Sequence, residues 1–206
     1  MRYERQIGDS VVVVNCEEDL SQQAAALLSK LEQLHGQGPP LHSGTVVQFG
    51  WSRLVLKPDG NDLVVCEPDF DHDPFSRTVP EVDRTLRVAA EQAGVCRLAK
   101  AVGPDVSFAQ TVVIAKGHLS TPMIYLDRRD PEVNGFSGWY LGPSAEETTI
   151  DSQEQLEPVY IYQLLNLRPA VIKVLNLPIN YLVVFSGDTI DMIFDATGTV
   201  VWPAQD

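Results

Sequence analysis

Short runs of β-branched and other apolar residues, separated by turn sequences, constrain the fold of this chain more than any other feature. Four consecutive valines, Val11–Val14, lie within the stretch 7–16, which we expect to form one buried strand. The runs 46–49, 53–57 and 63–67 are interrupted by tight-turn residues such as Pro58-Asp59-Gly60. Strands are also expected at 111–115, 123–126, 181–185, 188–194 and 200–202. This pattern predicts mostly antiparallel sheet, because short turns join consecutive strands.

Apolar residues at helical spacing predict helices between these strands. One stripe, which Gly36 ends, consists of Ala24, Leu27, Leu28, Leu31 and Leu34. A second helix is expected to begin near Pro80, because proline suits a first helical turn, and to end at Gly94. Shorter helices are expected at 160–167 and from Pro169 onward. The predicted fold class is therefore α+β, mostly antiparallel sheet with three to five helices.

The sequence Gly103-Pro104-Asp105 is the strongest candidate for a domain boundary. At 206 residues, the chain can form one large domain or two small ones that share an interface. We therefore expect an N-terminal α+β half, residues 1–103, and a C-terminal α+β half, residues 104–206.

The net charge limits the partners that the chain can bind. Its 15 Lys and Arg residues against 28 Asp and Glu residues give a formal charge of −13 at pH 7. Such a charge opposes binding to nucleic acid and to anionic lipid, since both are bound mainly through Lys and Arg. It favours a basic partner, although solubility alone is an alternative reason for the acidity.

Several features indicate a reducing compartment, and we expect the protein to be cytoplasmic. The cysteines Cys16, Cys66 and Cys96 are odd in number and widely spaced, which is typical of buried thiols rather than disulfides. Charged residues follow Met1 at once, so no signal peptide is expected. The apolar runs are too short to span a membrane.

The polar segment 67–73 is the one candidate for metal chemistry. Asp69, Asp71 and Asp73 copy the first three ligand positions of a calcium loop, but Pro74 stands where that loop requires glycine. A metal-dependent hydrolase using Glu67, these aspartates and His72 is therefore kept as an alternative. We expect no metal, no cofactor and no enzymatic activity, because no catalytic motif is present.

Acidic residues are concentrated toward the C-terminal end of the sequence. From Tyr140 to Asp206 there are nine Asp and Glu residues against only Arg168 and Lys173. Aromatic anchors beside carboxylates are typical of an interface for Lys and Arg. The predicted binding residues are Trp139, Tyr140, Glu146, Glu147, Asp151, Glu154 and Glu157. The alternative is that Trp139 belongs to the core and the acids form a solvated loop.

The second half also resembles a known family. Gly138-Trp139-Tyr140, then Gly142 with Glu146 and Glu147, precede a stretch from Pro169 to Pro178, an apolar strand and an Asp-containing strand. This order resembles the immunity proteins of bacterial polymorphic-toxin systems, in particular the immunity protein 33 group, over residues 110–200. The sequence departs from the family pattern where Gly142 and Glu146 are spaced apart by Pro-Ser-Ala.

The resemblance implies that the chain binds and neutralises a cognate secreted toxin, as in type VI secretion. Many such toxins are nucleases with basic active sites, so the predicted acids would pair with toxin Lys and Arg, and Trp139 or Tyr140 would anchor or support that surface. The alternatives are the hydrolase above and a structural or regulatory module that binds no toxin.

Overall fold

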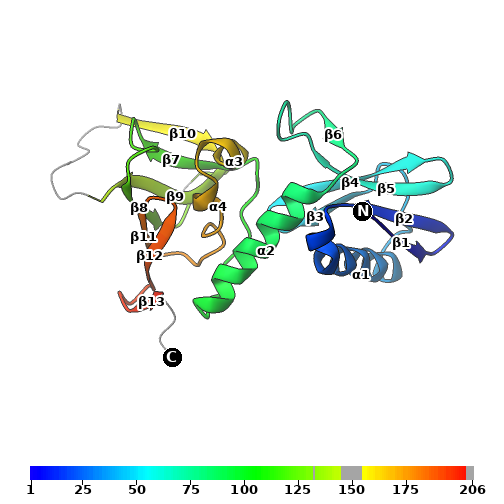
Figure 1. Cartoon of the computed structure of the whole chain (residues 1–206), viewed down its shortest axis with the longest axis horizontal. Helices are drawn as coiled ribbons and strands as arrows, with labels where there is room; N and C mark the ends of the chain where they lie inside the picture. Colours follow the sequence, from blue (N-terminus) through cyan, green and yellow to red (C-terminus); the bar gives the residue numbers. More distant parts are fainter. Residues whose placement is uncertain (132, 145–154, 203–206) are drawn as a thin grey trace. The chain divides into compact units, whose positions relative to one another are not determined.

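The protein divides into two compact units, Met1–Ala90 and Glu91–Asp206. The computed structural model describes residues 1–131, 133–144 and 155–202. Each unit contains one sheet in which most neighbouring strands are antiparallel, and the described residues form four α-helices in all (Figure 1). The prediction of an α+β fold with mostly antiparallel sheet and three to five helices is confirmed.

The sheet of the first unit has the order β1-β2-β5-β4-β3, and β6 pairs with β5. Only β2 and β5 are parallel, because the crossover that joins them includes α1. The elements in chain order are β1 (Arg2–Ile7), β2 (Ser10–Asn15), the short helix η1 (Glu18–Leu20), α1 (Ser21–Gln37), β3 (Val46–Phe49), β4 (Ser52–Asp59), β5 (Asp62–Pro68), β6 (Thr78–Val79) and α2 (Asp83–Leu98).

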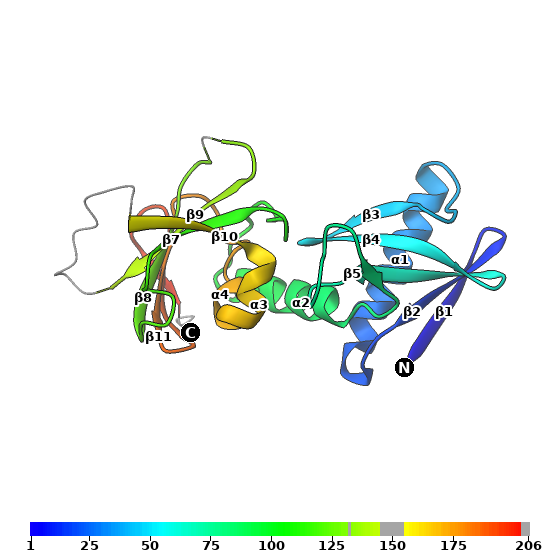
Figure 2. The same ribbon diagram turned by 90° about the horizontal axis from the view of Figure 1, so that it is seen from above.

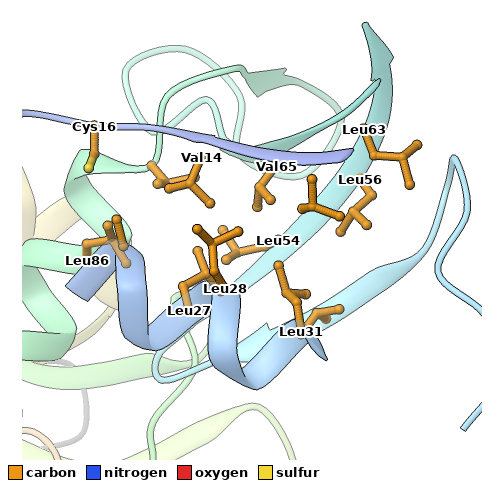
Figure 3. Close-up of a cluster of buried hydrophobic side chains, with 14 of the residues drawn as sticks. Val14, Cys16, Leu27, Leu28, Leu31, Leu54, Leu56, Leu63, Val65 and Leu86 are labelled. Carbon is orange, nitrogen blue, oxygen red and sulfur yellow. The ribbon is translucent and has the colours of Figure 1, made fainter. Parts of the chain in front are cut away.

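Helix α1 covers one face of this sheet (Figure 2). Its predicted apolar stripe, with the exception of Leu34, points into the core, where Leu27 and Leu31 are fully buried. Figure 3 shows these leucines in one hydrophobic cluster with Leu54 of β4 and Val14 of β2. Burial of a leucine side chain contributes roughly 1.5–3 kcal/mol, so this stripe fixes the helix on the sheet.

The prediction of one strand over residues 7–16 is wrong, because the chain turns inside it. Strands β1 and β2 form a hairpin in which Ile7 pairs with Ser10. Gly8 occupies the turn with a φ of +59°, a conformation that glycine adopts without steric cost. Strand β1 is not apparent from the sequence, because it contains the charged residues Arg2 and Glu4. These residues are tolerated in β1 because an edge strand can expose one face to water.

Helix α2 continues past Gly94, so the prediction that it ends there is wrong. It ends at Leu98, and the residue with left-handed backbone is Lys100, with a φ of 51°. The backbone N–H groups of Lys100 and Ala101 donate to the carbonyls of Arg97 and Cys96, which is the Schellman arrangement of a helix end. A glycine inside a helix costs only about 1 kcal/mol, which the surrounding packing offsets.

The seven strands of the second unit have the order β10-β7-β9-β8-β11-β12-β13 among the described residues. Only β7 and β9 are parallel. After α2 the elements are β7 (Thr111–Ala115), β8 (Met123–Arg128), β9 (Phe136–Pro143), β10 (Leu156–Tyr160), η3 (Ile161–Gln163), α3 (Leu164–Leu167), α4 (Pro169–Ile172), β11 (Leu182–Ser186), β12 (Thr189–Phe194) and β13 (Val200–Trp202). The strands expected at 181–185 and 188–194 correspond to β11 and β12, which pair as an antiparallel hairpin, and the helix that Pro169 begins is also present.

The core of the second unit lies on one side of its sheet. Helices α3 and α4 lie against the same side of the strands in Figures 1 and 2. We call this side the inner face. It includes Ile114, Leu126, Leu141, Val183 and Ile193, which are each at most 1% exposed and pair across the sheet.

The boundary between the compact units falls inside α2, between Ala90 and Glu91. Gly103, the predicted boundary residue, lies within the second unit. A Cβ atom there would come 2.3 Å from the Asn176 carbonyl oxygen, so glycine permits a close backbone approach at this position. That residues 1–103 and 104–206 are separate domains stays a prediction.

Candidate functional site

Strand β9 places the two predicted aromatic residues on opposite faces of the second sheet. Trp139 is 1% exposed and lies in the core. Its indole N–H donates to the Leu175 carbonyl at 2.9 Å, and the Arg128 guanidinium lies 5.6 Å from its ring centre. Trp139 therefore packs in the core against the inner face of the sheet and has no exposed surface for contact with a binding partner.

Tyr140 lies on the opposite, outer face and forms a pair with Tyr125 of β8. The two ring centres are 5.8 Å apart, with an angle of 52° between the ring planes. A Cβ atom on Gly142 would come 2.9 Å from the Tyr140 hydroxyl and 3.2 Å from a Tyr125 ring carbon. The absence of a side chain at Gly142 therefore lets both rings lie over the strand. Burial, and secondarily the Tyr125 hydroxyl, raise the pKa of Tyr140 to about 12, so Tyr140 stays neutral at physiological pH.

Two neighbouring cross-strand rows continue this outer face. Tyr140 pairs with Asp127, and the row continues through Leu182 to Phe194. In the next row, Gly142 pairs with Tyr125, followed by Val184 and Met192. We call the apolar members of these rows the tyrosine face; they are half-buried and comprise Tyr125, Tyr140, Leu182, Val184, Met192 and Phe194.

Among the predicted acids, the structure describes only Glu157. It is exposed on β10, the strand at one end of the sheet order, where it pairs with Ile114 of β7. Glu146, Glu147, Asp151 and Glu154 lie outside the described residues. Their part in binding therefore stays a prediction that rests on the sequence.

Two arginines of the second unit, Arg128 and Arg168, are buried. Arg128 is 4% exposed and donates to the carbonyls of Pro104 and Leu177. Arg168 is 6% exposed and donates to carbonyls of the 119–121 turn and of Gly187. Burial lowers the pKa of both arginines, that of Arg128 to about 10.

The exposed Arg129 has its guanidinium 2.7 Å from the Asp127 carboxylate. Lys173 forms an ion pair with Glu91 at 3.4 Å. The whole second unit has 14 acidic and seven basic residues, a net formal charge of −7. Because two of its seven basic residues are internal, its surface is more acidic than this number indicates.

The 67–73 segment engages its carboxylates in separate local contacts. Glu67 is buried and accepts hydrogen bonds from the backbone N–H groups of Arg84 and Thr85, so it caps the first turn of α2. Asp69 contacts the His72 ring at 2.9 Å. Asp71 pairs with the Arg84 guanidinium at 2.7 Å.

Asp73 accepts from the backbone N–H of Phe75 at 3.0 Å and from the hydroxyl of Ser76, which completes this set of local contacts. Among residues 1–131, 133–144 and 155–202, no three His, Cys, Asp or Glu side chains gather in a way that could hold a metal ion. The segment's geometry thus fits the local structure of a loop and a helix start.

The three cysteines are free, and only Cys96 is partly exposed. Burial raises the pKa of all three thiols, which opposes the thiolate form that a nucleophile requires. No helix in the described part of the chain is long and apolar enough to cross a membrane.

The tyrosine face is not predictable from the sequence, because its strands carry apolar residues on both faces of the sheet. The segment 123–128 alternates between inner Ile124 and Leu126 and outer Met123 and Tyr125, so polar and apolar residues do not alternate. The same problem affects β12, where a register shift between β11 and β12 disturbs the pattern of Ile190 and Met192. The sequence signal that could have indicated this face is a tyrosine in each of two neighbouring strands, Tyr125 and Tyr140, together with Gly142.

Comparison with family models places the chain in the Imm33-like family. The Imm33-like domain matches residues 91–196, which is 106 of the 206 residues and begins where the second compact unit begins. The chain therefore belongs to this family, and the predicted resemblance of its C-terminal half to immunity proteins is confirmed. Comparison with curated proteins and with solved structures gave no match.

Proposed function

We propose that this chain is an immunity protein that binds and neutralises a cognate, basic secreted toxin in the cytoplasm. The observation that carries the proposal is the Imm33-like domain over residues 91–196. The toxin is the chain's protein partner, and neutralisation needs no catalysis or cofactor by this chain. A toxin delivered by type VI secretion and acting as a nuclease would present such a basic surface.

The charge distribution supports a basic partner. The second unit has a net formal charge of −7, and Arg128 and Arg168 are internal. Opposite charge on the partner would accelerate association and disfavour acidic competitors. Four further acids, Glu146, Glu147, Asp151 and Glu154, follow β9 in the sequence, and we propose that they pair with toxin Lys and Arg.

The experiment begins with capture of partners by the purified chain from the bacterium that encodes it, at low and high salt. The captured basic protein is then expressed in a sensitive strain with and without this chain. We expect the wild-type chain to restore growth and to bind more weakly at high salt, because salt screens exposed charges. A captured protein that is not toxic, or whose toxicity the chain leaves unchanged, would contradict neutralisation.

Charge reversal tests the acidic segment directly. The triple variant Glu146→Lys, Glu147→Lys and Asp151→Lys should reduce toxin affinity at least about tenfold, because close charge pairs across an interface contribute roughly 1.5 kcal/mol or more. The matched control reverses Asp9, Glu18 and Glu81 of the first unit, which are all exposed, and produces the same change in net charge. Equal protection by both variants would show that the segment is not the binding surface.

A further inference from the structure

The tyrosine face is an apolar surface that no described helix covers. Its six members are half-buried, whereas their inner-face neighbours Leu141 and Val183 are fully buried. Figures 1 and 2 show these two helices on the inner side only. An antiparallel sheet that faces water on one side usually carries polar residues there, so this apolar outer face is unusual. Continuous apolar surface of this kind marks an interaction site.

The composition of the face fits a protein interface. Tyrosine, methionine and phenylalanine are enriched in interface cores, and tyrosine is frequent among the residues whose truncation weakens binding most. Tyr125 and Tyr140 are already held against each other over Gly142. Little side-chain freedom would therefore be lost when a partner covers them.

The charges around the face indicate the partner's chemistry. Asp127 lies within the Tyr140 row, where the exposed Arg129 guanidinium is 2.7 Å from its carboxylate, and Asp191 is exposed on β12. On the inner side, the guanidinium groups of Arg128 and Arg168 donate hydrogen bonds to backbone carbonyls. A partner for this surface would thus have an apolar centre and a rim of Lys and Arg. A second copy of this chain would bring its own aspartates to the same rim, which like charges oppose.

We infer that the tyrosine face is the surface on which the basic toxin docks, with Tyr125 and Tyr140 as its central contacts and the neighbouring aspartates as its rim. The inference rests on the proposed function and names where on the second unit the binding occurs. Strand β9 carries Tyr140 and is followed in the sequence by Glu146, Glu147, Asp151 and Glu154, whereas Glu157, the one described member of the predicted acids, pairs with Ile114 of the inner face.

The test uses the full chain and the toxin identified in the growth experiment. Tyr140→Ala should weaken toxin binding about thirtyfold or more, as expected for a central interface tyrosine. Gly142→Ala should weaken it about tenfold, because the added methyl group displaces both rings without removing any charge. The matched control is Gly94→Ala, where nothing lies within 4 Å of the added Cβ atom; it should leave the affinity unchanged.

A second measurement protects the test against variants that unfold. Hydroxyl-radical footprinting of the wild-type chain should show that Tyr125, Tyr140 and Met192 become protected when the toxin binds. Full affinity in both the Tyr140→Ala and Gly142→Ala variants, with protection at another surface, would overturn the inference while leaving the proposed function intact. If the wild-type chain binds and neutralises no basic toxin, the proposed function itself fails.

Self-association is measured by sedimentation of the wild-type chain alone. We expect a monomer. A dimer that Tyr140→Ala dissociates would overturn the inference, since a second copy would then be the occupant of the face.

Discussion

The two compact units differ in how each buries an ionisable side chain. In the first unit, Glu67 is 3% exposed and accepts from two backbone N–H groups at the start of α2. In the second, Arg128 is 4% exposed and donates to two backbone carbonyls. Within the described residues, neither forms an ion pair. Backbone groups of the opposite polarity thus take the place of a counter-ion in both units.

Burial shifts both groups toward their neutral forms, but with different consequences. Desolvation raises the pKa of Glu67 to about 7 and lowers that of Arg128 to about 10. Only the glutamate therefore changes charge near physiological pH. We therefore expect Glu67 to make the stability of the first unit depend on pH near neutrality, whereas Arg128 has no such effect on the second unit.

The largest effect is expected for Arg128→Ala. This change removes the donors to the Pro104 and Leu177 carbonyls and the contact over Trp139. The cavity and the unsatisfied carbonyls together should lower the free energy of unfolding by about 4 kcal/mol, measured by chemical denaturation. The neighbouring Arg129→Ala is the control, since its guanidinium is exposed and its ion pair with Asp127 contributes at most about 1 kcal/mol. Similar losses of unfolding free energy in the two variants would contradict the prediction, because burial of the guanidinium would then have no effect on stability.

Glu67 should produce a smaller effect that depends on pH. Its folded pKa of about 7 lies above the ordinary value of 4.5, so the folded state binds more protons between these two values. The free energy of unfolding should therefore fall as pH rises from about 4.5 to 7, by up to about 3 kcal/mol, and then level off. Below pH 4.5 the group is protonated in both states and contributes no slope.

Glu67→Gln isolates this contribution. The amide oxygen can still accept from the Arg84 and Thr85 N–H groups, but the side chain no longer titrates. We expect the difference in unfolding free energy between wild type and variant to change over pH 4.5–7 as described. Exposed Glu81→Gln is the control for removal of a carboxylate at the surface. A wild-type profile that rises through this range while the Gln variant stays flat would contradict the assignment.

Local sequence signals predicted those parts of the fold in which residue type and conformation agree. The run Thr111–Ala115 forms β7, because β-branched residues suit a pleated strand in a core. Pro169 occupies the first turn of α4, where its missing N–H costs nothing. These features need no knowledge of distant residues.

Features that depend on distant residues were not predictable in this way. Helix α2 ends at Leu98 and is capped at Lys100, a residue with no preference for left-handed backbone, so the cap is visible only in the hydrogen bonds of the folded chain. Strand β10 was missed because Pro158 and Glu157 disfavour a strand, yet it pairs with β7. The tyrosine face depends on the pairing register of β8, β9, β11 and β12. A shift of one residue in this register would move the side chains to the opposite face of the sheet.

The helix shared by the two units gives the smallest expected effect, through Gly94→Ala. Gly94 lies inside α2, and nothing is within 4 Å of an added Cβ atom, so alanine fits without strain. Alanine should stabilise the fold by about 0.5–1 kcal/mol, because it restricts the unfolded chain more than glycine does. The midpoint temperature of thermal unfolding should rise by about 1–4 °C.

Gly117→Ala is the matched control for this change. The space around Gly117 is equally open, but its φ of +78° is unfavourable for alanine, so we expect a loss of about 1 kcal/mol instead of a gain. Repeating Gly94→Ala in the Glu67→Gln background tests whether the two positions are coupled through α2. A gain that disappears in that background would couple Gly94 to the capped start of the helix, whereas an unchanged gain would show that the two positions act independently.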